Sequence, residues 1–365
     1  AGLALALTAA VAAETWDDRF GVPNLNNQLF ALDVSASETV AIGGSFSGNS
    51  AGNPGALNAN KVALWNGASW STLGTGPDHG PGGPVHAVKW LGNELYVGGE
   101  FPGANNLPAN HLIRWDGSSW HPLVAGGVTG LNGSVHALAT AGDHLYVAGR
   151  FTTAGPVVAN CVARWDGTTW SALGGGISGG ATPVVTALAV APDGSVYVGG
   201  MFTSASGVPA VNIARWDGSS WSPLGTGITG PGAIVRAIAV ASNGDVVAGG
   251  NFTTAGGQPA QNLARWNGST WQEVVGGVQE GEVLALAYDG DDLWVGGTFT
   301  KANTYIVPYL GVLQNGIWQI PGIQGVNGEV RQIVVRPAGV YLVGFFQNAG
   351  DRTGLLSMAK WDRTE

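Results

Sequence analysis

One unit of about 50 residues recurs along the whole 365-residue chain, and this repeat constrains the fold more than any other feature. Each copy has a Gly-Gly-x-Phe segment or a close variant of it; the Phe residues that bring the copies into register are Phe46, Phe101, Phe151, Phe202, Phe252, Phe299 and Phe346. In most copies a Trp follows 14 residues later and a second Trp five residues after that, as Trp115 and Trp120 follow Phe101. The chain therefore carries seven copies of one structural unit.

Each copy contains four short runs of strand-forming residues separated by turn signals. In the fourth copy the runs are VVTALAV, SVYVGG, NIARW and SWSPLG, and turn sequences such as PDG and DGSS lie between them. Four strands in a unit of this length are typical of one blade of a β-propeller. A single blade cannot bury both faces of its sheet, whereas blades packed radially against one another can. We therefore predict an all-β fold, a seven-bladed β-propeller with four antiparallel strands per blade.

The two ends of the chain predict how the ring closes. The last copy stops at MAKWDRTE after Trp361, where the second Trp and the outer strand of the unit are missing. The segment ETWDDRFG, near the start of the chain, places Trp16 ahead of the first complete copy. We predict that the N-terminal strand joins the C-terminal blade, which leaves no unpaired sheet edge at the junction. Residues 14–365 then form a single domain.

Residues 1–13 (AGLALALTAAVAA) form a separate apolar segment. The segment is shorter than the roughly 20 residues that a membrane helix needs, and its small-residue end is typical of a signal-peptidase site. We interpret it as the apolar part of a secretory signal, with an anchor helix or a retained extension as alternatives. The expected location is secreted, periplasmic or at the cell surface, without membrane insertion of the propeller itself.

Charge and cysteine content exclude several classes of protein. A net charge of −9 is a poor electrostatic match to a nucleic-acid backbone, so we expect no nucleic-acid partner. Cys161 is the single cysteine and has no second cysteine for an internal disulfide or a zinc site. The sequence contains no phosphate loop, nucleophile elbow or cofactor fingerprint, and we expect neither a cofactor nor a metal ion.

The order of the motifs resembles a known family of repeats. A Gly-Gly pair at the end of one strand, followed by Trp-Asp-Gly-x-x-Trp-x-x-Leu, resembles the kelch and galactose-oxidase-type propeller repeat. The variant GGxFTxAGG…IARWDGSSW is more similar to repeats of bacterial secreted propellers and of the fungal cortical polarity marker. The resemblance covers residues 14–365 and implies the fold, but those families bind, scaffold and catalyse on the same frame. The catalytic copper site of galactose oxidase is not carried over, because the sequence around Cys161 lacks the cross-linked Cys–Tyr pair.

Loop length indicates which face of the ring carries function. The first-to-second and third-to-fourth connections of each blade are tight, whereas the second-to-third and inter-blade connections, such as TSASGVPAV and GTGITGPGA, are long. Binding residues usually lie on longer loops held by a rigid frame, so we assign the binding face to the long-loop rim. A protein or a glycan is the expected partner there.

Two positions on the long-loop rim vary while their neighbours repeat. At the start of the innermost strand the variable residues are Phe30, His86, His136, Thr186, Arg236, Leu284 and Arg331. At the end of the second strand they are Ser45, Glu100, Arg150, Met201, Asn251, Thr298 and Phe345. The predicted ligand-binding residues at the channel mouth are His86, Glu100, His136, Arg150, Arg236, Asn251 and Arg331. They would suit an anionic or sugar ligand, and an unconstrained, solvated channel mouth is the alternative.

Three functions are compatible with these residues. We favour a non-catalytic extracellular or periplasmic propeller that binds or scaffolds a partner. A lyase or hydrolase would use His86, His136, Glu100 and Arg150, with the imidazoles as acid and base or, with Glu100, as metal ligands. A multivalent lectin would stack sugars on the repeated Trp residues, although their spacing around a tight turn favours a packing role.

Charged residues outside the channel mouth give two further expectations. Arg114 and Asp116 lie two residues apart on one strand and share a face, which predicts a charge pair within the strand, repeated in the following blades. Asp289, Asp291 and Asp292 form a dense acidic turn in YDGDDLW, which we interpret as a hairpin turn because its spacing matches no calcium loop.

Two copies depart from the repeat. The sixth replaces Trp-Asp-Gly by Leu313, Gln314 and Asn315, and its apolar flank would mark a partner surface or a local repacking. The first carries an insertion at residues 47–60 on the long-loop rim, either a partner-specific loop or a tolerated extension.

Overall fold

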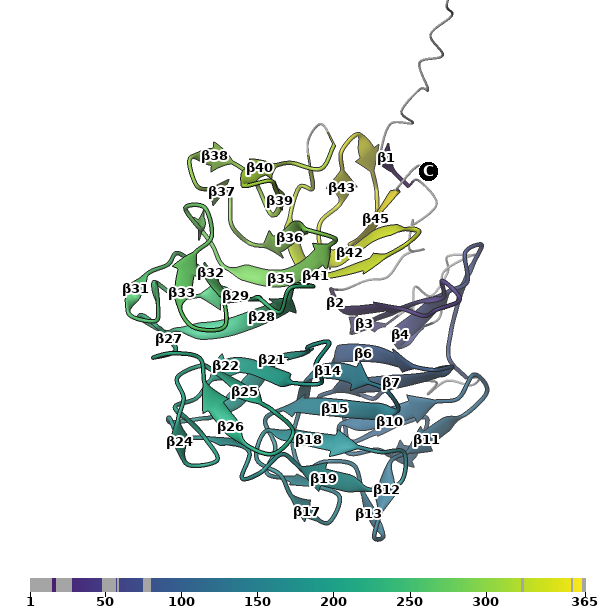
Figure 1. Ribbon diagram of the computed structural model, residues 1–365. Coiled ribbons are helices and arrows are strands. Elements are labelled where there is room, and N and C mark those ends of the chain that lie inside the picture. Colours follow the sequence, from purple (N-terminus) through teal and green to yellow (C-terminus); the bar gives the residue numbers. More distant parts are fainter. Residues whose placement is uncertain are drawn as a thin grey trace, which may run out of the picture.

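The computed structural model describes residues 15–17, 28–47, 57, 59–74, 80–322, 325–355 and 357–362. Within these ranges the regular elements are β-strands, and seven four-stranded antiparallel sheets lie around a central channel (Figure 1). The prediction of an all-β propeller built from four-stranded sheets is confirmed. The apolar segment 1–13 and most of the insertion at 47–60 lie outside the described residues, so the interpretation of both stays a prediction.

The strands of each sheet run from the channel outward. The innermost strands are β2 (Leu29–Val34), β6 (Val85–Leu91), β14 (Val135–Ala141), β21 (Val184–Val190), β28 (Ile234–Val240), β35 (Val283–Asp289) and β41 (Glu329–Arg336). The second strands are β3 (Val40–Ser47), β7 (Glu94–Gly99), β15 (His144–Gly149), β22 (Val196–Met201), β29 (Val246–Asn251), β36 (Asp292–Gly297) and β42 (Gly339–Phe345).

The outer half of each sheet carries the Trp residues. The third strands are β4 (Asn60–Trp65), β10 (Leu112–Trp115), β18 (Val162–Trp165), β25 (Ile213–Trp216), β32 (Leu263–Trp266), β39 (Leu310–Gln314) and β45 (Met358–Asp362). The outermost strands are β5 (Trp70–Ser71), β11 (Trp120–Pro122), β19 (Trp170–Ala172), β26 (Trp221–Pro223), β33 (Trp271–Glu273), β40 (Ile317–Gln319) and β1 (Thr15–Trp16). We number the blades one to seven in the order of their innermost strands.

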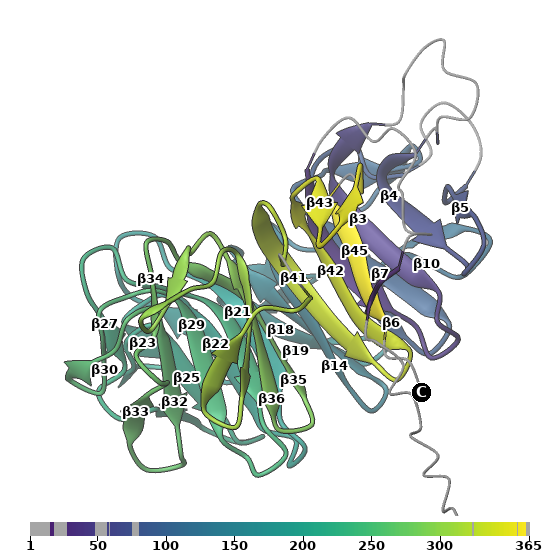
Figure 2. The same cartoon turned by 90° about the horizontal axis from the view of Figure 1, so that it is seen from above.

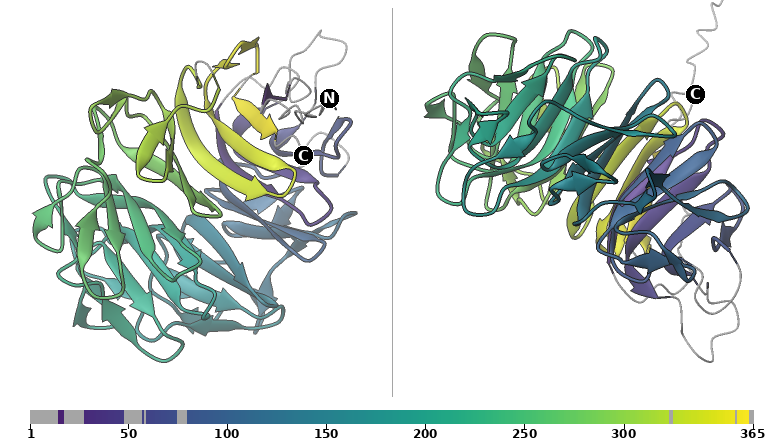
Figure 3. Two further views of the ribbon diagram at one scale, coloured as in Figure 1. Left: turned by 45° about the horizontal axis from the view of Figure 1, so that its top comes forward. Right: turned by 90° about the horizontal axis from the view of Figure 1, so that it is seen from below.

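The ring closes between the two ends of the chain, as the repeat predicted. Each innermost strand contacts that of the next blade, and β41 contacts β2. The N-terminal strand β1 pairs antiparallel with β45, with Trp16 opposite Trp361, and supplies the fourth strand of blade seven. Figures 2 and 3 show the strands of blade seven beside those of blade one, and Tyr341 of blade seven packs in one apolar cluster with Leu29.

The Gly-Gly motif at the end of the second strand allows the blades to approach closely. A Cβ added to Gly98 would lie 2.4 Å from Cγ1 of Val135 in the next blade. A Cβ added to Gly99 would lie 2.0 Å from the carbonyl oxygen of Pro84 in its own blade. Neither position accepts a side chain, so the repeated glycines are required by packing between and within blades.

The long connections are not irregular loops, because most of them fold into short hairpins or three-stranded sheets on the long-loop rim. Their strands are β8 (Gly103–Ala104), β9 (Leu107–Pro108), β12 (Val124–Ala125), β13 (Val128–Thr129), β16 (Thr153–Ala154), β17 (Val157–Val158), β20 (Ile177–Ser178), β23 (Ser204–Ala205), β24 (Val208–Pro209), β27 (Ile228–Thr229), β30 (Thr254–Ala255), β31 (Gln258–Pro259), β34 (Val278–Gln279), β37 (Lys301–Ala302), β38 (Tyr305–Ile306), β43 (Asn348–Ala349) and β44 (Arg352–Thr353). Within the described residues, most of the rim connections therefore have paired backbone.

The Trp pairs pack between blades. The indole Nε1 of Trp221 donates to the carbonyl oxygen of Leu173 in the preceding inter-blade segment, and Trp271 makes the same bond to Leu224, both at 2.7 Å. Trp221 and Trp271 are each only 6% exposed. Because a sugar needs an accessible ring to stack on, these indoles do not support the lectin alternative.

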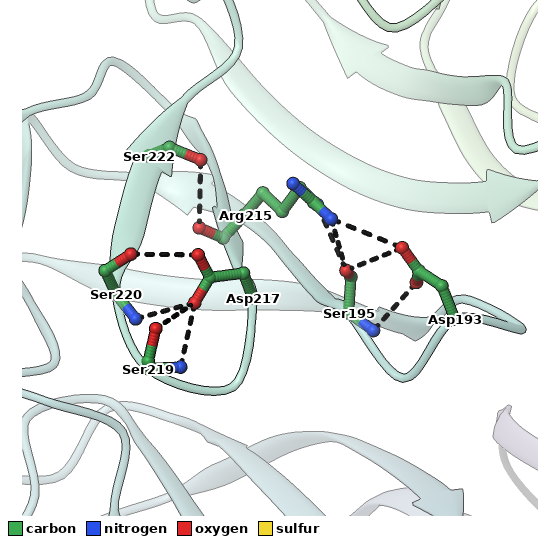
Figure 4. Close-up of polar contacts among 7 residues, drawn as sticks. All are labelled: Asp193, Ser195, Arg215, Asp217, Ser219, Ser220 and Ser222. Atoms are coloured by element: carbon green, nitrogen blue, oxygen red, sulfur yellow. Dashed lines mark hydrogen bonds and ion pairs between the residues drawn. The ribbon is translucent and has the colours of Figure 1, made fainter.

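The predicted charge pair within the third strand is wrong for Arg215 and Asp217 (Figure 4), although Lys360 and Asp362 form such a pair on β45. Arg215 reaches across the sheet to Ser195 and Asp193, with its Nη2 3.2 Å from Oδ2 of Asp193. Asp217 instead accepts hydrogen bonds from the backbone N–H groups of Ser220 and Ser219, which hold its pKa well below the usual range. An Asp at the first position of a tight turn bonds to the backbone two and three residues on, and this local bond wins over the strand neighbour.

Candidate functional site

The variable residues of the innermost strands all lie at β-bulges. Each innermost strand shifts its pairing register around one residue near its start; these residues are Phe30, His86, His136, Thr186, Arg236, Leu284 and Arg331. A bulge leaves one residue out of the ladder and re-aims its side chain. The bulges direct all seven side chains to the channel mouth, where they line one cavity of about 320 Å³.

One side of this cavity is an arc of aromatic rings. The ring of Phe30 stacks on that of His86 with centroids 5.6 Å apart, and His86 lies 5.4 Å from His136. The guanidinium carbon of Arg331 lies 4.9 Å from the centroid of Phe30 and continues the arc. Side chains from four consecutive blades (seven, one, two and three) thus form a continuous aromatic and cationic wall.

Both imidazoles are neutral at pH 7. Burial lowers the pKa of His136 to about 4. Electrostatic interactions with His86 when it is protonated, Arg150 and Arg236 act in the same direction, against the opposing effect of Glu100. Burial also lowers the pKa of His86, which Glu100 partly offsets and Arg331 reinforces. Neutral imidazoles can accept a proton or a hydrogen bond, but they cannot supply the positive charge that an anionic ligand would need.

Two carboxylates that the sequence did not indicate complete the cavity. Glu282 pairs with Arg236 (Oε2 to Nε, 2.9 Å), and Glu329 pairs with Arg331 (Oε1 to Nε, 2.6 Å). Each Arg of the cavity is therefore paired with its own Glu, so of the two expected ligand classes, an anion or a sugar, the charge pattern gives less support to the anion. Both Glu residues directly precede the repeated Val of the innermost strand, and comparing that position across the copies would have found them.

The predicted residues of the second strands lie farther out. Oε1 of Glu100 is 3.8 Å from Nε2 of His86, and its side chain is 56% exposed. Arg150 and Asn251 are exposed on the rim, and neither is among the residues that line the cavity. The structure thus gathers His86, His136, Arg236 and Arg331 in one cavity and places Glu100, Arg150 and Asn251 around it.

Two buried polar atoms of the cavity make no hydrogen bond within the described residues. They are Nε2 of His86, which has Oε1 of Glu100 3.8 Å away, and Nε of Arg331, which is in an ion pair with Glu329. His136, by contrast, has its Nε2 3.0 Å from Oγ of Ser134. Because buried polar atoms are nearly always hydrogen-bonded, Nε2 of His86 can still take a hydrogen-bond partner.

The described residues give no sign of a metal centre. Within them, no three His, Cys, Asp or Glu side chains are grouped so that they could hold a metal ion. The described ranges also contain no helix long and apolar enough to cross a membrane.

A family model matches part of the chain. Residues 175–312 match the Rax2 C-terminal beta propeller domain, and the match spans less than half of the chain. No curated protein matches the sequence. The match supports a β-propeller, whereas the kelch-like character of the repeats stays a prediction.

Several solved structures are similar over almost the whole chain. YCF48 bound to D1 peptide has a TM-score of 0.54 and 16% identity, and the alignment covers 94% of each chain. The extracellular domain of a hybrid two-component system from B. thetaiotaomicron has a TM-score of 0.61 and 11% identity over 97% of this chain and 40% of that one. Catalytically inactive virginiamycin B lyase from Staphylococcus aureus with quinupristin has a TM-score of 0.56 and 13% identity over 93% and 97% of the two chains. At these identities the likenesses show the fold, and this chain has the fold of a β-propeller.

Proposed function

We propose that the protein is a non-catalytic binding propeller, outside the cell or in the periplasm, that receives a segment of a partner protein at the long-loop channel mouth. The observation that carries the proposal is the buried Nε2 of His86, which makes no hydrogen bond within the described residues and lies beside the ring of Phe30. A neutral imidazole with this environment accepts a hydrogen bond from a ligand while the neighbouring ring packs on the ligand's apolar part.

The charges of the cavity support a neutral polar segment as the ligand. Arg236 and Arg331 are held by Glu282 and Glu329, so a bound anion would have to break an ion pair before it gained one. A peptide supplies backbone N–H and C=O groups without net charge, which suits a wall of rings and paired charges. The structure of YCF48 with D1 peptide is an example of a similarly folded chain with a bound peptide.

The lyase or hydrolase alternative has less support. Acid–base catalysis needs one group that supplies a proton near neutral pH, and the low pKa of His136 and the lowered pKa of His86 leave both imidazoles without one. The extracellular or periplasmic location rests on the apolar segment at residues 1–13, which stays an interpretation of the sequence.

Panning a random-peptide phage library on the wild-type protein and on the variant His86→Phe tests the proposal. Phe keeps a ring beside Phe30 and removes Nε2, so selected peptides should bind the variant at least about tenfold more weakly. His144→Phe, which changes a histidine on the opposite rim, is the matched control and should bind normally. Failure to enrich any peptide, or equal binding to His86→Phe, would overturn the proposal. Glycans that bind the wild type and lose affinity for His86→Phe on an array would assign the same cavity to a sugar instead.

A further inference from the structure

Most blades carry a cation on the third strand that pairs with an acid of the same blade. Arg265 of blade five lies 3.0 Å from Asp245, Arg215 of blade four pairs with Asp193, and Arg114 of blade two pairs with Glu94. In each case the acid comes from the second strand or from the turn before it. The pair lies near the short-turn end of its blade.

Blade six keeps the acid of this pair and lacks the cation. Arg265 pairs in register with Val247 on β29, and the corresponding pair on β39 and β36 is Val312 with Trp294. Asp292 lies two residues before Trp294, as Asp245 lies two residues before Val247. The repeat thus places a carboxylate at Asp292 and an apolar Val where its Arg partner would stand.

A cavity of about 180 Å³ lies at this position between blades six and seven, where Figure 1 shows β36, β39 and β40 next to β42 and β45. Its polar and aromatic lining residues are Asp289, Asp292, Trp294, Gln314, Gln319 and Trp361. The acidic turn and the irregular third strand, two separate departures noted in the sequence, therefore meet at one cavity.

The lining is pre-arranged for a cation. Nε2 of Gln319 donates to Oε1 of Gln314 at 3.0 Å, and Nε2 of Gln314 donates to Oδ2 of Asp292 at 2.7 Å. This chain of amides holds the carboxylate of Asp292, and Trp294, two residues farther along the same strand, also lines the cavity. Indole is the aromatic side chain that attracts a cation most strongly. The aromatic lining would therefore add to the attraction between a bound cation and the carboxylate of Asp292.

Blade seven shows how a cation sits in such a setting. Lys360 occupies the third-strand position that pairs with Tyr341, and its Nζ lies 5.5 Å from the centroid of that ring. The same Nζ is 2.6 Å from Oδ1 of Asp362. At this position of the repeat, blade seven therefore places a cation between an aromatic ring and a carboxylate.

We propose that the cavity between blades six and seven binds the guanidinium group of an arginine side chain supplied by a partner polypeptide. Three blades show an Arg paired with an acid at the corresponding position, and a planar guanidinium both stacks on indole and bonds to carboxylate. The site lies on the short-turn rim, at the β35–β36 and β39–β40 turns, and is separate from the channel mouth on the long-loop rim. It therefore goes beyond the proposed function and stands independently of it.

Titration of the full-length protein with the peptide acetyl-Gly-Arg-Gly-amide, followed by calorimetry and Trp fluorescence, tests the proposal. The matched peptide with citrulline in place of Arg keeps the shape and removes the charge. We expect saturable binding of the arginine peptide at concentrations up to about 10 mM and at least about tenfold weaker binding of the citrulline peptide.

Variants of the chain test whether the arginine peptide binds in this cavity. Asp292→Asn should lower the affinity for the arginine peptide at least about tenfold. Asp291→Asn, in the same turn but outside the cavity lining, should leave that affinity unchanged. Val312→Arg restores the repeat, so its own side chain should fill the cavity, abolish peptide binding and raise the melting temperature. Equal binding of the two peptides, or an unchanged affinity in Asp292→Asn, would overturn the proposal even if Val312→Arg does not fold. Tighter binding of tetramethylammonium than of the arginine peptide would overturn the assignment to guanidinium.

Discussion

Trp16 and Trp361 lie opposite each other in the pairing of β1 with β45, with ring centroids 5.0 Å apart and planes at 71°. The first described strand of the chain thereby completes the last blade. Trp16 is 4% exposed and Trp361 6%, so both rings are buried at the junction.

Replacing Trp16 by Ala should markedly destabilise the protein. The change removes a buried ring from the junction that closes the propeller, at a cost of about 3–5 kcal/mol. Thermal unfolding followed by circular dichroism should show a clearly lower melting temperature for Trp16→Ala and a smaller loss for Trp16→Phe. Identical melts for Trp16→Ala and wild type would contradict the role of β1 in closure.

Acidification should weaken the fold through the channel-mouth histidines. His136 has a pKa of about 4 in the folded protein against the ordinary histidine value of 6.5, so the unfolded chain takes up the proton first as pH falls. The stabilising contribution is complete above pH 6.5 and is lost as pH falls toward 4. The charged groups that face His136 are Glu100, Arg150 and Arg236, besides His86, whose pKa moves in the same direction.

Two measurements check this pH dependence. An NMR titration should give an apparent pKa for His136 well below that of a free imidazole. The drop in melting temperature between about pH 7 and about pH 4.5 should be smaller in His136→Gln, which cannot titrate. An equal drop in the variant and the wild type would rule out His136 as a contributor.

Removing the carboxylates of the mouth should convert it into an anion site. In the double variant Glu282→Gln and Glu329→Gln, Arg236 and Arg331 lose the partners that neutralise them. Their guanidinium groups then become available for bidentate contacts to an oxyanion. Calorimetry with inorganic phosphate should detect binding to the double variant and none to the wild type. Glu273→Gln, an exposed change on β33, is the control, and phosphate binding by that variant or by wild type would contradict the assigned charge balance.

Exchanging Cys161 for Asn should stabilise the chain. Cys161 has φ +61°, a conformation that Asn adopts more readily than other non-glycine residues. Asn212, at the same position of blade four with φ +61°, accepts from the N–H of Phe202 at 3.0 Å and donates to the carbonyl oxygen of Ile228 at 2.8 Å. Cys161→Asn could form the same bonds and gain about 1 kcal/mol.

The reverse exchange at the same position of blade four provides a second test. Asn212→Cys should lower the melting temperature, because it removes both side-chain bonds and leaves the left-handed backbone in place. Burial raises the pKa of the Cys161 thiol to about 11, so its removal deletes no reactive group. A lower melting temperature for Cys161→Asn would show that the thiol packs better than the amide bonds.

The repeat carried most of the fold information. Regularly spaced strands, tight turns and the Trp missing after Trp361 predicted the four-stranded sheets and the closing strand at Trp16, because each of these features is local in sequence. Alignment of the copies also identified His86 and His136. Each varies between neighbours that repeat, because the residue at the β-bulge is left out of the strand pairing.

Long-range charge partners could not be obtained in this way. Arg236 and Glu282 are 46 residues apart and belong to different blades, so no spacing within one copy relates them. The local reading of Arg114 with Asp116 was wrong for the same reason, because Arg114 reaches Glu94 on the adjacent strand while Asp116 closes its own turn.

The sequence by itself determined the all-β class, the blades, their closure and the residues released toward the channel, because strand period, turn chemistry and repeat register are properties of neighbouring residues. The tertiary structure decided that the channel mouth is electrically balanced and that blade six holds Asp292 beside Trp294 with no Arg opposite. Both depend on which side chains of different strands and blades come within a few ångströms of each other, and only the packed ring defines those distances.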